Sequence, residues 1–311
     1  MNDSVDIESA HHHHKGHGHT ANGPTDGSRF IHSLRGVKKM KDVFYVRKRH
    51  IKHGYRAHEC MTVGKCSKSL FMLHNETFNV WTHLLCGLYY IYHSEFKLQS
   101  SYIVMVVGSM ACITCMVFSA IYHLYNSVNR DWYNTLLKFD LIGIGFKITG
   151  LAITLIYTGF HNFPNIGNPL AILLLLMMFS NLGFSLTPCY MDDKYSYFRA
   201  TYYLVLVLSL FLVALSYTCF IATDAELHIF FTRLMVGFAY IGIGFFFYAS
   251  GFPERASSNY WVQIVFQGHV WWHMLVFANG YTLYWILYDA LMHVEGVYFG
   301  SATETVDFTQ Q

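Results

Sequence analysis

The stretch SYIVMVVGSMACITCMVFSAIYHL, residues 101–124, contains no Asp, Glu, Lys or Arg. A helix rises 1.5 Å per residue, so about 20 apolar residues cross the roughly 30 Å hydrocarbon core of a bilayer. This stretch therefore predicts a transmembrane helix. The whole 311-residue chain agrees, because it is 53% hydrophobic and only 13% charged, whereas a soluble domain is about 25% charged.

Similar apolar runs recur along the chain and predict an all-α membrane protein with seven transmembrane helices. The third, sixth and seventh runs contain polar residues and are less apolar than the others, so the count of seven rests on the pattern as a whole. The predicted spans are 77–94, 101–124, 137–160, 169–189, 200–222, 228–250 and 262–288.

Basic residues predict the orientation of these spans, because Lys and Arg accumulate on the cytoplasmic side of a membrane. Twelve of the twenty-one Lys and Arg residues lie between positions 29 and 68, before the first span. The loops after the even-numbered spans hold Arg130, Lys194, Arg199 and Arg255, whereas the opposite loops hold only Lys97. We therefore expect a cytoplasmic N-terminus and an extracellular or lumenal C-terminus.

Four regions follow from this topology. Residues 1–28 form a predicted disordered, His-rich tail, and residues 29–76 form a basic cytoplasmic juxtamembrane region. Residues 77–291 form the seven-transmembrane domain, and residues 292–311 a short extracellular or lumenal tail. The basic region is expected to form one or two helices on the inner membrane surface, attracted to anionic lipids. Because this membrane role accounts for its charge, no nucleic-acid partner is expected.

Polar side chains inside spans indicate functional sites, because each costs a few kcal/mol in hydrocarbon. The first span opens with HNETFNVWTHL at 74–84, and the third contains Lys147, for which pairing with a carboxylate or a place in a cavity are both open. On the predicted topology one further group lies toward the inner face. Its members are Ser119, His123, Asp140, His269 and His273.

Three imidazoles and a carboxylate at one depth predict a metal site. His269 and His273 are four residues apart, so they share one face of a helix, and His123 supplies a third nitrogen. Three protein ligands with a fourth position open for water are typical of catalytic zinc. Asp140 is then an outer partner, a water-mediated ligand or a general base, and Ser119 hydrogen-bonds the site. Interhelical hydrogen bonding or a proton relay are the alternatives.

Several ordered motifs resemble the progestin and adipoQ receptor family, specifically its adiponectin-receptor-like branch of haemolysin III-related proteins. They are HNETFNVWTHL at 74–84, SAIYHL at 119–124, KFD at 138–140, GFPER at 251–255 and HVWWH at 269–273. The resemblance implies seven helices, an internal N-terminus and a buried zinc ion toward the inner leaflet. It also implies that His123, His269 and His273 are the ligands and that Ser119 and Asp140 are the functional polar pair beside them. One departure is Gly268-His269-Val270, where the family has Ser-His-Gln.

Members of this family are described as receptors for protein or steroid ligands, as ceramide hydrolases and, in fungi, as regulators of lipid and zinc homeostasis. We therefore expect a Zn²⁺-containing receptor with lipid-amide (ceramide) hydrolase activity. It would lie in the plasma membrane or an internal membrane, in contact with membrane lipids and an extracellular protein or steroid ligand. The alternatives are a binding-only receptor or homeostasis regulator with structural zinc, and a proton or cation transporter that uses Lys147, Asp140 and the histidines.

Overall fold

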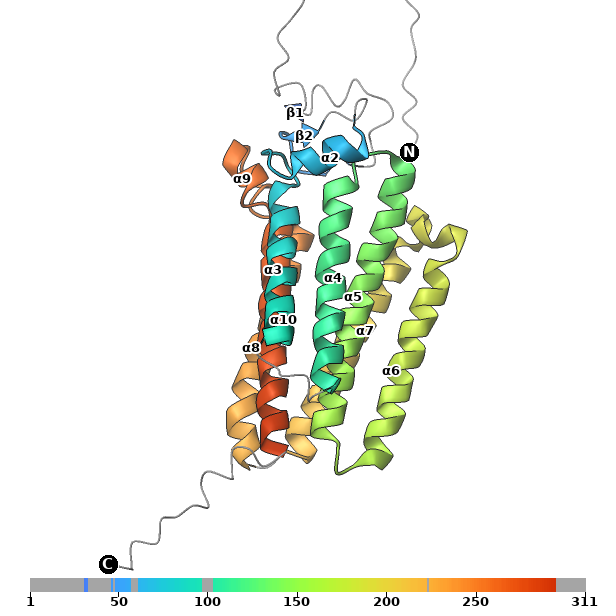
Figure 1. Cartoon of the computed structure of the whole chain (residues 1–311), viewed down its shortest axis with the longest axis vertical. Coiled ribbons are helices and arrows are strands. Elements are labelled where there is room, and N and C mark those ends of the chain that lie inside the picture. Colours follow the sequence, from blue (N-terminus) through green and yellow to red (C-terminus); the bar gives the residue numbers. More distant parts are fainter. Residues whose placement is uncertain are drawn as a thin grey trace, which may run out of the picture.

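The computed structural model describes residues 31–32, 46, 48–56, 61–96, 103–222 and 224–294. Within them the chain folds into seven helices of 20 to 30 residues, which run along the long axis of the molecule (Figure 1). These are α3 (Thr77–Phe96), α4 (Ile103–Tyr125), α5 (Arg130–Gly159), α6 (Pro164–Ser185), α7 (Ser196–Phe220), α8 (Asp224–Ser250) and α10 (Gly268–Val294).

Short elements complete the described part of the chain. Helices α2 (Val63–Ser69) and α9 (Tyr260–Ile264) lie at one end of the bundle, together with strands β1 (Ile31–His32) and β2 (Tyr55–Arg56) (Figure 1). The two strands pair antiparallel, with Ile31 opposite Arg56. Two 3₁₀ turns, η4 (Pro188–Met191) and η5 (Asp193–Tyr195), join α6 to α7. At this end α2 is the one helix between residues 61 and 76.

The prediction of an all-helical fold is confirmed, since each predicted span overlaps one long helix. Five helical segments are long and apolar enough to cross a membrane: α4, α5, α6, α7 and residues 231–250 of α8. The predicted tail at 1–28 lies outside the described residues, as does residue 295 onward of the predicted tail at 292–311. Helix α10 itself continues to Val294.

The predicted start of the last span, residue 262, is wrong by six residues. The chain forms the separate helix α9 and then breaks before α10 begins at Gly268. At the break, backbone groups are paired with side chains. Gly268 N–H donates to Glu254 Oε2 at 2.6 Å, and the side-chain amide of Gln267 donates to Asn75 O at 2.6 Å. A hydropathy pattern carries no information about such side-chain contacts with the start of a helix.

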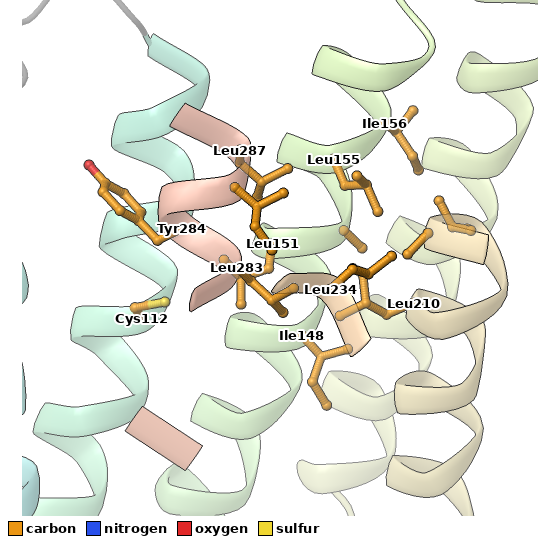
Figure 2. Close-up of a cluster of buried hydrophobic side chains, with 14 of the residues drawn as sticks. Cys112, Ile148, Leu151, Leu155, Ile156, Leu210, Leu234, Leu283, Tyr284 and Leu287 are labelled. Atoms are coloured by element: carbon orange, nitrogen blue, oxygen red, sulfur yellow. The ribbon is translucent and has the colours of Figure 1, made fainter. Parts of the chain in front are cut away.

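The helices α5 and α10 occupy the centre of the bundle. Helix α5 contacts α4, α6, α7 and α10, and α10 contacts α3, α4, α5 and α8. Aliphatic side chains fill the space between α5, α7, α8 and α10, and Figure 2 shows Leu151, Leu155, Leu210, Leu234 and Leu283 meeting there. All of these side chains are at most 8% exposed.

Small residues let α4 and α5 approach closely. A Cβ atom added at Gly143 would lie 3.0 Å from Cys115 Cα, and one at Gly150 would collide with Ala111 Cβ. Close backbone approach through small residues is the usual way in which helices associate in lipid. This contact fixes α4, which carries His123, against α5, which carries Asp140.

We predict that Gly150→Ala destabilises the protein by about 1–3 kcal/mol, because it forces a second methyl group into a filled space. The double variant Gly150→Ala with Ala111→Gly should recover most of the loss, since it moves the methyl from one helix to the other. Gly183→Ala is the matched control, because no atom lies within 4 Å of the added Cβ. Thermal unfolding in detergent micelles measures all three, and equal midpoints for Gly150→Ala and Gly183→Ala would contradict the prediction.

Candidate metal centre

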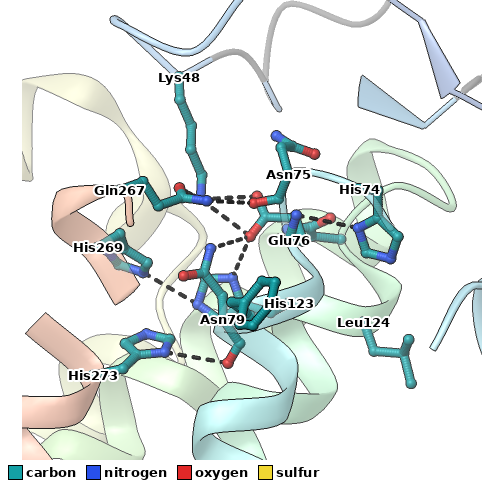
Figure 3. A network of polar contacts seen from close by, with 12 residues as sticks. Lys48, His74, Asn75, Glu76, Asn79, His123, Leu124, Gln267, His269 and His273 are labelled. Atoms are coloured by element: carbon teal, nitrogen blue, oxygen red, sulfur yellow. Dashed lines mark hydrogen bonds and ion pairs between the residues drawn. The ribbon is translucent and has the colours of Figure 1, made fainter. Parts of the chain in front are cut away.

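Three histidines from two helices meet at the end of the bundle that carries α2 and α9. His123 lies in the last turn of α4, and His269 and His273 lie in the first two turns of α10. One ring nitrogen from each lies within 4.8 Å of the other two, and His123 Nε2 is 3.2 Å from His269 Nε2. His123 and His273 are each 2% exposed, and Figure 3 shows the three rings turned toward one another.

Two of these rings are held through Nδ1. His123 Nδ1 lies 2.9 Å from Glu76 Oε2, and His273 Nδ1 lies 3.2 Å from Asn79 O. A carboxylate and a carbonyl accept hydrogen bonds and cannot donate them, so each Nδ1 carries the proton. Each Nε2 then presents a lone pair, which is the state in which imidazole binds a metal.

The spacing of two of the nitrogens matches that of ligands on a tetrahedral zinc ion. Zinc–nitrogen bonds of about 2.0–2.1 Å at tetrahedral angles place two ligand nitrogens about 3.3–3.4 Å apart. His123 Nε2 and His269 Nε2 are 3.2 Å apart, and the third nitrogen lies within the 4.8 Å envelope. The donor set and its protonation therefore suit zinc, and His123, His269 and His273 are the residues that can hold it.

Glu76 is the carboxylate in contact with this cluster. It directly precedes α3 and is 4% exposed. Burial alone would raise the pKa of this carboxyl group, but the Lys48 ammonium and hydrogen bonds from His123 and Asn79 hold the pKa well below its usual range. Glu76 is therefore ionised and orients the His123 ring.

From the sequence, Asp140 is expected to be an outer partner of the histidines, a water-mediated ligand or a general base, whereas Glu76 is not singled out. Asp140 on α5 interacts with the Ser119 hydroxyl, but its carboxylate is not among the groups within 4.8 Å of one another. Ser119 is 2% exposed and lies one turn before His123 on α4. The structure thus places the predicted pair beside the histidines without joining them to the cluster.

His83 and Lys147 are buried polar residues that lie beyond the cluster. The His83 ring stacks on His273 with ring centroids 3.6 Å apart, and within the described residues neither of its nitrogens has a hydrogen-bond partner. Lys147 Nζ donates to the carbonyl of Val276 at 2.6 Å. A backbone carbonyl therefore takes the place of the carboxylate that was one of the two options for Lys147.

His74, which the sequence grouped with the functional candidates, has a structural environment. Its Nδ1 accepts from Glu76 N–H at 3.1 Å, and its Nε2–H donates to Ser69 O at 3.1 Å. Burial and the nearby charge of Arg56 lower the pKa of His74 to about 3. The ring is neutral, and it joins α2 to the turn before α3.

The chain matches a known protein family. The haemolysin-III-related family matches residues 71–284, more than half of the chain and the part that contains all three histidines. The chain belongs to this family. The predicted resemblance is confirmed, and five membrane-crossing segments in a member of this family make the protein a multi-pass integral membrane protein.

Individual relatives are named as receptors. The adiponectin receptor protein of Drosophila melanogaster is 28% identical over 240 residues, which cover 70% of this chain and 51% of the relative. Progestin and adipoQ receptor-like protein 1 of Caenorhabditis elegans is 26% identical over 258 residues, covering 76% of this chain and 56% of the relative. Mouse progestin and adipoQ receptor family member 3 is 25% identical over 260 residues, covering 76% and 78%. This chain matches only about half the length of the Drosophila and Caenorhabditis relatives.

The environment of His74 predicts a loss of stability in acid. Its pKa is 6.5 in an ordinary setting and about 3 in the folded protein, so between these values the unfolded chain binds more protons and stability falls as pH drops. At pH 5 the loss from this residue is about 2 kcal/mol relative to pH 7.5. His74→Asn keeps an acceptor for Glu76 N–H and removes the titration.

Unfolding of both proteins in mixed micelles at pH 7.5 and pH 5 measures the difference. His74→Asn should lose less free energy of unfolding between the two pH values than the unsubstituted chain, even where it is less stable at pH 7.5. An equal loss in both proteins would show that His74 is not held neutral by its surroundings.

Proposed function

We propose that this chain is a zinc-containing, seven-transmembrane receptor of adiponectin-receptor type that hydrolyses a lipid amide of the ceramide class. The observation that carries the proposal is the pair of Nε2 atoms 3.2 Å apart on His123 and His269, with the proton of His123 fixed on Nδ1 by Glu76. Receptor names among the relatives support a ligand-binding membrane protein. By analogy with those names, the ligand on the far side of the membrane is a protein or a steroid.

Seven spans are part of the proposal, with α3 and α10 added to the five apolar segments. Both have the length to cross, with 20 and 27 residues. Their polar residues lower their hydropathy but turn away from lipid: Asn79, His83 and His273 are 0%, 4% and 2% exposed. Polar side chains that face the interior of a bundle are compatible with a membrane span.

The proposed orientation places the histidine cluster toward the cytoplasm. Lys48, from the basic region before α3, lies beside the cluster (Figure 3). Arg56, from the same region, donates to the carbonyl of His123. Lys65 and Lys68 lie on α2 at the same end of the bundle. A concentration of basic residues at one end of a membrane bundle indicates the cytoplasmic side.

The chemistry follows from the residues around the cluster. A zinc ion held by His123, His269 and His273 would polarise an amide carbonyl and acidify a water molecule. In this proposal Asp140 would take up a proton from the attacking water, and the Ser119 hydroxyl, which hydrogen-bonds to it, would hold its carboxylate. Glu76 keeps the His123 ring in one orientation during this proton transfer.

We expect the purified protein to contain about one zinc ion per chain, with three nitrogen ligands. His123→Ala, His269→Ala and His273→Ala should each remove it, since each deletes one of the clustered nitrogens. His161→Ala is the control, because His161 follows α5 at the opposite end of that helix from Asp140. Elemental analysis after gel filtration in detergent measures the content, and a metal-free unsubstituted protein would overturn the proposal.

Asp140→Asn separates the enzyme from a receptor in which zinc is only structural. Loss of the proton acceptor should lower ceramide hydrolysis in micelles by about 10²–10⁴-fold, while zinc content stays near one per chain. Asp131→Asn, an exposed carboxylate in the first turn of the same helix, should retain full activity. If unsubstituted protein with zinc releases no fatty acid, the binding-only receptor replaces the enzyme. If Asp140→Asn hydrolyses as fast as the unsubstituted protein, Asp140 is not the proton acceptor.

A further inference from the structure

The chain segment that precedes the first long helix reaches into the histidine cluster. Lys48 Nζ lies 2.9 Å from Glu76 Oε1 and 3.1 Å from Glu76 Oε2, and it donates to Gln267 Oε1 at 3.4 Å (Figure 3). The Lys48 side chain is 28% exposed and the Glu76 side chain is 5% exposed. A residue 28 positions before Glu76 thus binds both oxygens of the carboxylate that holds His123.

The segment around Lys48 is fixed by contacts that do not involve its ammonium group. Tyr55 OH donates to Ile51 O at 2.9 Å, and Lys52 N–H donates to Gln263 Oε1 at 2.8 Å. Gly54 has a φ of 79°, which favours glycine, and its carbonyl accepts from Asn75 N–H at 2.9 Å. Removal of the Lys48 ammonium therefore leaves the backbone of the segment anchored.

Glu76 transmits the position of Lys48 to the metal-binding ring. Its Oε2 contacts His123 Nδ1 at 2.9 Å and accepts from Asn79 Nδ2 at 2.6 Å, while its Oε1 lies 2.9 Å from Lys48 Nζ. A carboxylate with both oxygens held has one orientation, and its hydrogen bond fixes the imidazole plane. Residues that orient metal ligands in this way typically change metal affinity by 10- to 100-fold when altered.

We propose that Lys48 and Glu76 are positioning residues of the metal centre, so that the cytoplasmic segment 48–56 is an integral part of it. The Lys48 ammonium fixes the Glu76 carboxylate, and the carboxylate turns His123 Nε2 toward His269 and His273. This inference rests on the metal binding in the proposed function and adds the basic region to the centre. It makes a folded juxtamembrane segment a condition for tight metal binding.

We consider the substitution Lys48→Met. The direction in which it changes metal affinity distinguishes a positioning role of Lys48 from simple charge repulsion. A lysine near a divalent cation repels it, so by Coulomb's law alone its removal would tighten metal binding. If Lys48 acts by fixing Glu76, its removal weakens metal binding, because the His123 ring is then less firmly oriented. The two explanations predict changes in opposite directions.

The test compares full-length variants in detergent by competition with a chelator for Zn²⁺ and by the absorption spectrum of the Co²⁺ form. Glu76→Gln should weaken Zn²⁺ binding by about 10- to 100-fold, and Lys48→Met by about tenfold. Both should shift the Co²⁺ bands, because the geometry at His123 changes. Lys48→Arg should restore affinity and spectrum, since it retains a charged donor to the carboxylate.

Lys52→Met is the matched control, because it keeps the backbone N–H that anchors the segment and removes only an ammonium that donates to the exposed Ser258 Oγ at 2.7 Å, away from Glu76. Its affinity and spectrum should equal those of the unsubstituted protein. Unchanged or tighter Zn²⁺ binding in Lys48→Met, with an unchanged Co²⁺ spectrum, would overturn the inference, as would a failure of Lys48→Arg to restore it. An unsubstituted protein that binds neither ion would instead overturn the proposed function.

A lower thermal stability of a metal-free variant would not by itself explain weaker Zn²⁺ binding together with shifted Co²⁺ bands. Lys48→Met and Glu76→Gln change different segments, so a common spectral shift in the two supports positioning. Opposite or absent shifts in the two folded variants count against it.

Discussion

The buried carboxylate of Glu76 is the group around which this end of the protein is organised. Removing an ionised carboxylate from water costs several kcal/mol unless it gains charged and hydrogen-bonded partners. Glu76 obtains them from Lys48 in the preceding segment, from Asn79 in α3 and from His123 at the end of α4. The stabilisation of one charge therefore draws three separate parts of the chain together, and the last of them supplies an imidazole.

The end of α4 is held from a second direction by Arg56. This guanidinium donates to the His123 carbonyl at 2.9 Å and to the Leu124 carbonyl at 2.6 Å. The last carbonyls of a helix lack partners within it and carry partial negative charge, so a buried arginine is a suitable cap. His123 is thus fixed by its backbone through Arg56 and by its ring through Glu76.

The sequence was sufficient to predict the helices and the three histidines, because both follow from short-range rules. Apolar runs of about 20 residues mark helices, the i, i+4 spacing of His269 and His273 puts them on one face, and the basic bias sets their depth together with His123. Glu76 was visible in the motif HNETFNVWTHL at 74–84, but its contact with His123 joins residues 47 positions apart. The depth argument placed Asp140 equally well, and depth alone does not say which carboxylate touches the ring.

The role of Lys48 and the start of α10 could not be predicted from short-range rules either, because both depend on contacts between residues that are not neighbours in sequence. The position of Lys48 depends on a turn at Gly54 and on contacts with residues more than 200 positions away, such as Gln263 and Gln267. The start of α10 depends on local crowding: a Cβ at Gly268 would lie 2.7 Å from Phe252 O and closer still to Phe247 O. Glycine in place of the serine expected from the family is therefore a packing requirement here.

The rotation of α10 about its own axis links the histidine cluster to the interior of the bundle. His269, His273, Val276 and Gly280 are spaced by four, three and four residues, so they lie on one face of the helix. Lys147 on α5 donates to Val276 O at 2.6 Å, and a Cβ at Gly280 would lie 3.0 Å from Lys147 Cε. A buried lysine that needs this carbonyl and this empty space accepts only one rotation of α10. That rotation turns His269 and His273 toward His123, so α5 positions two of the three candidate ligands without contributing one.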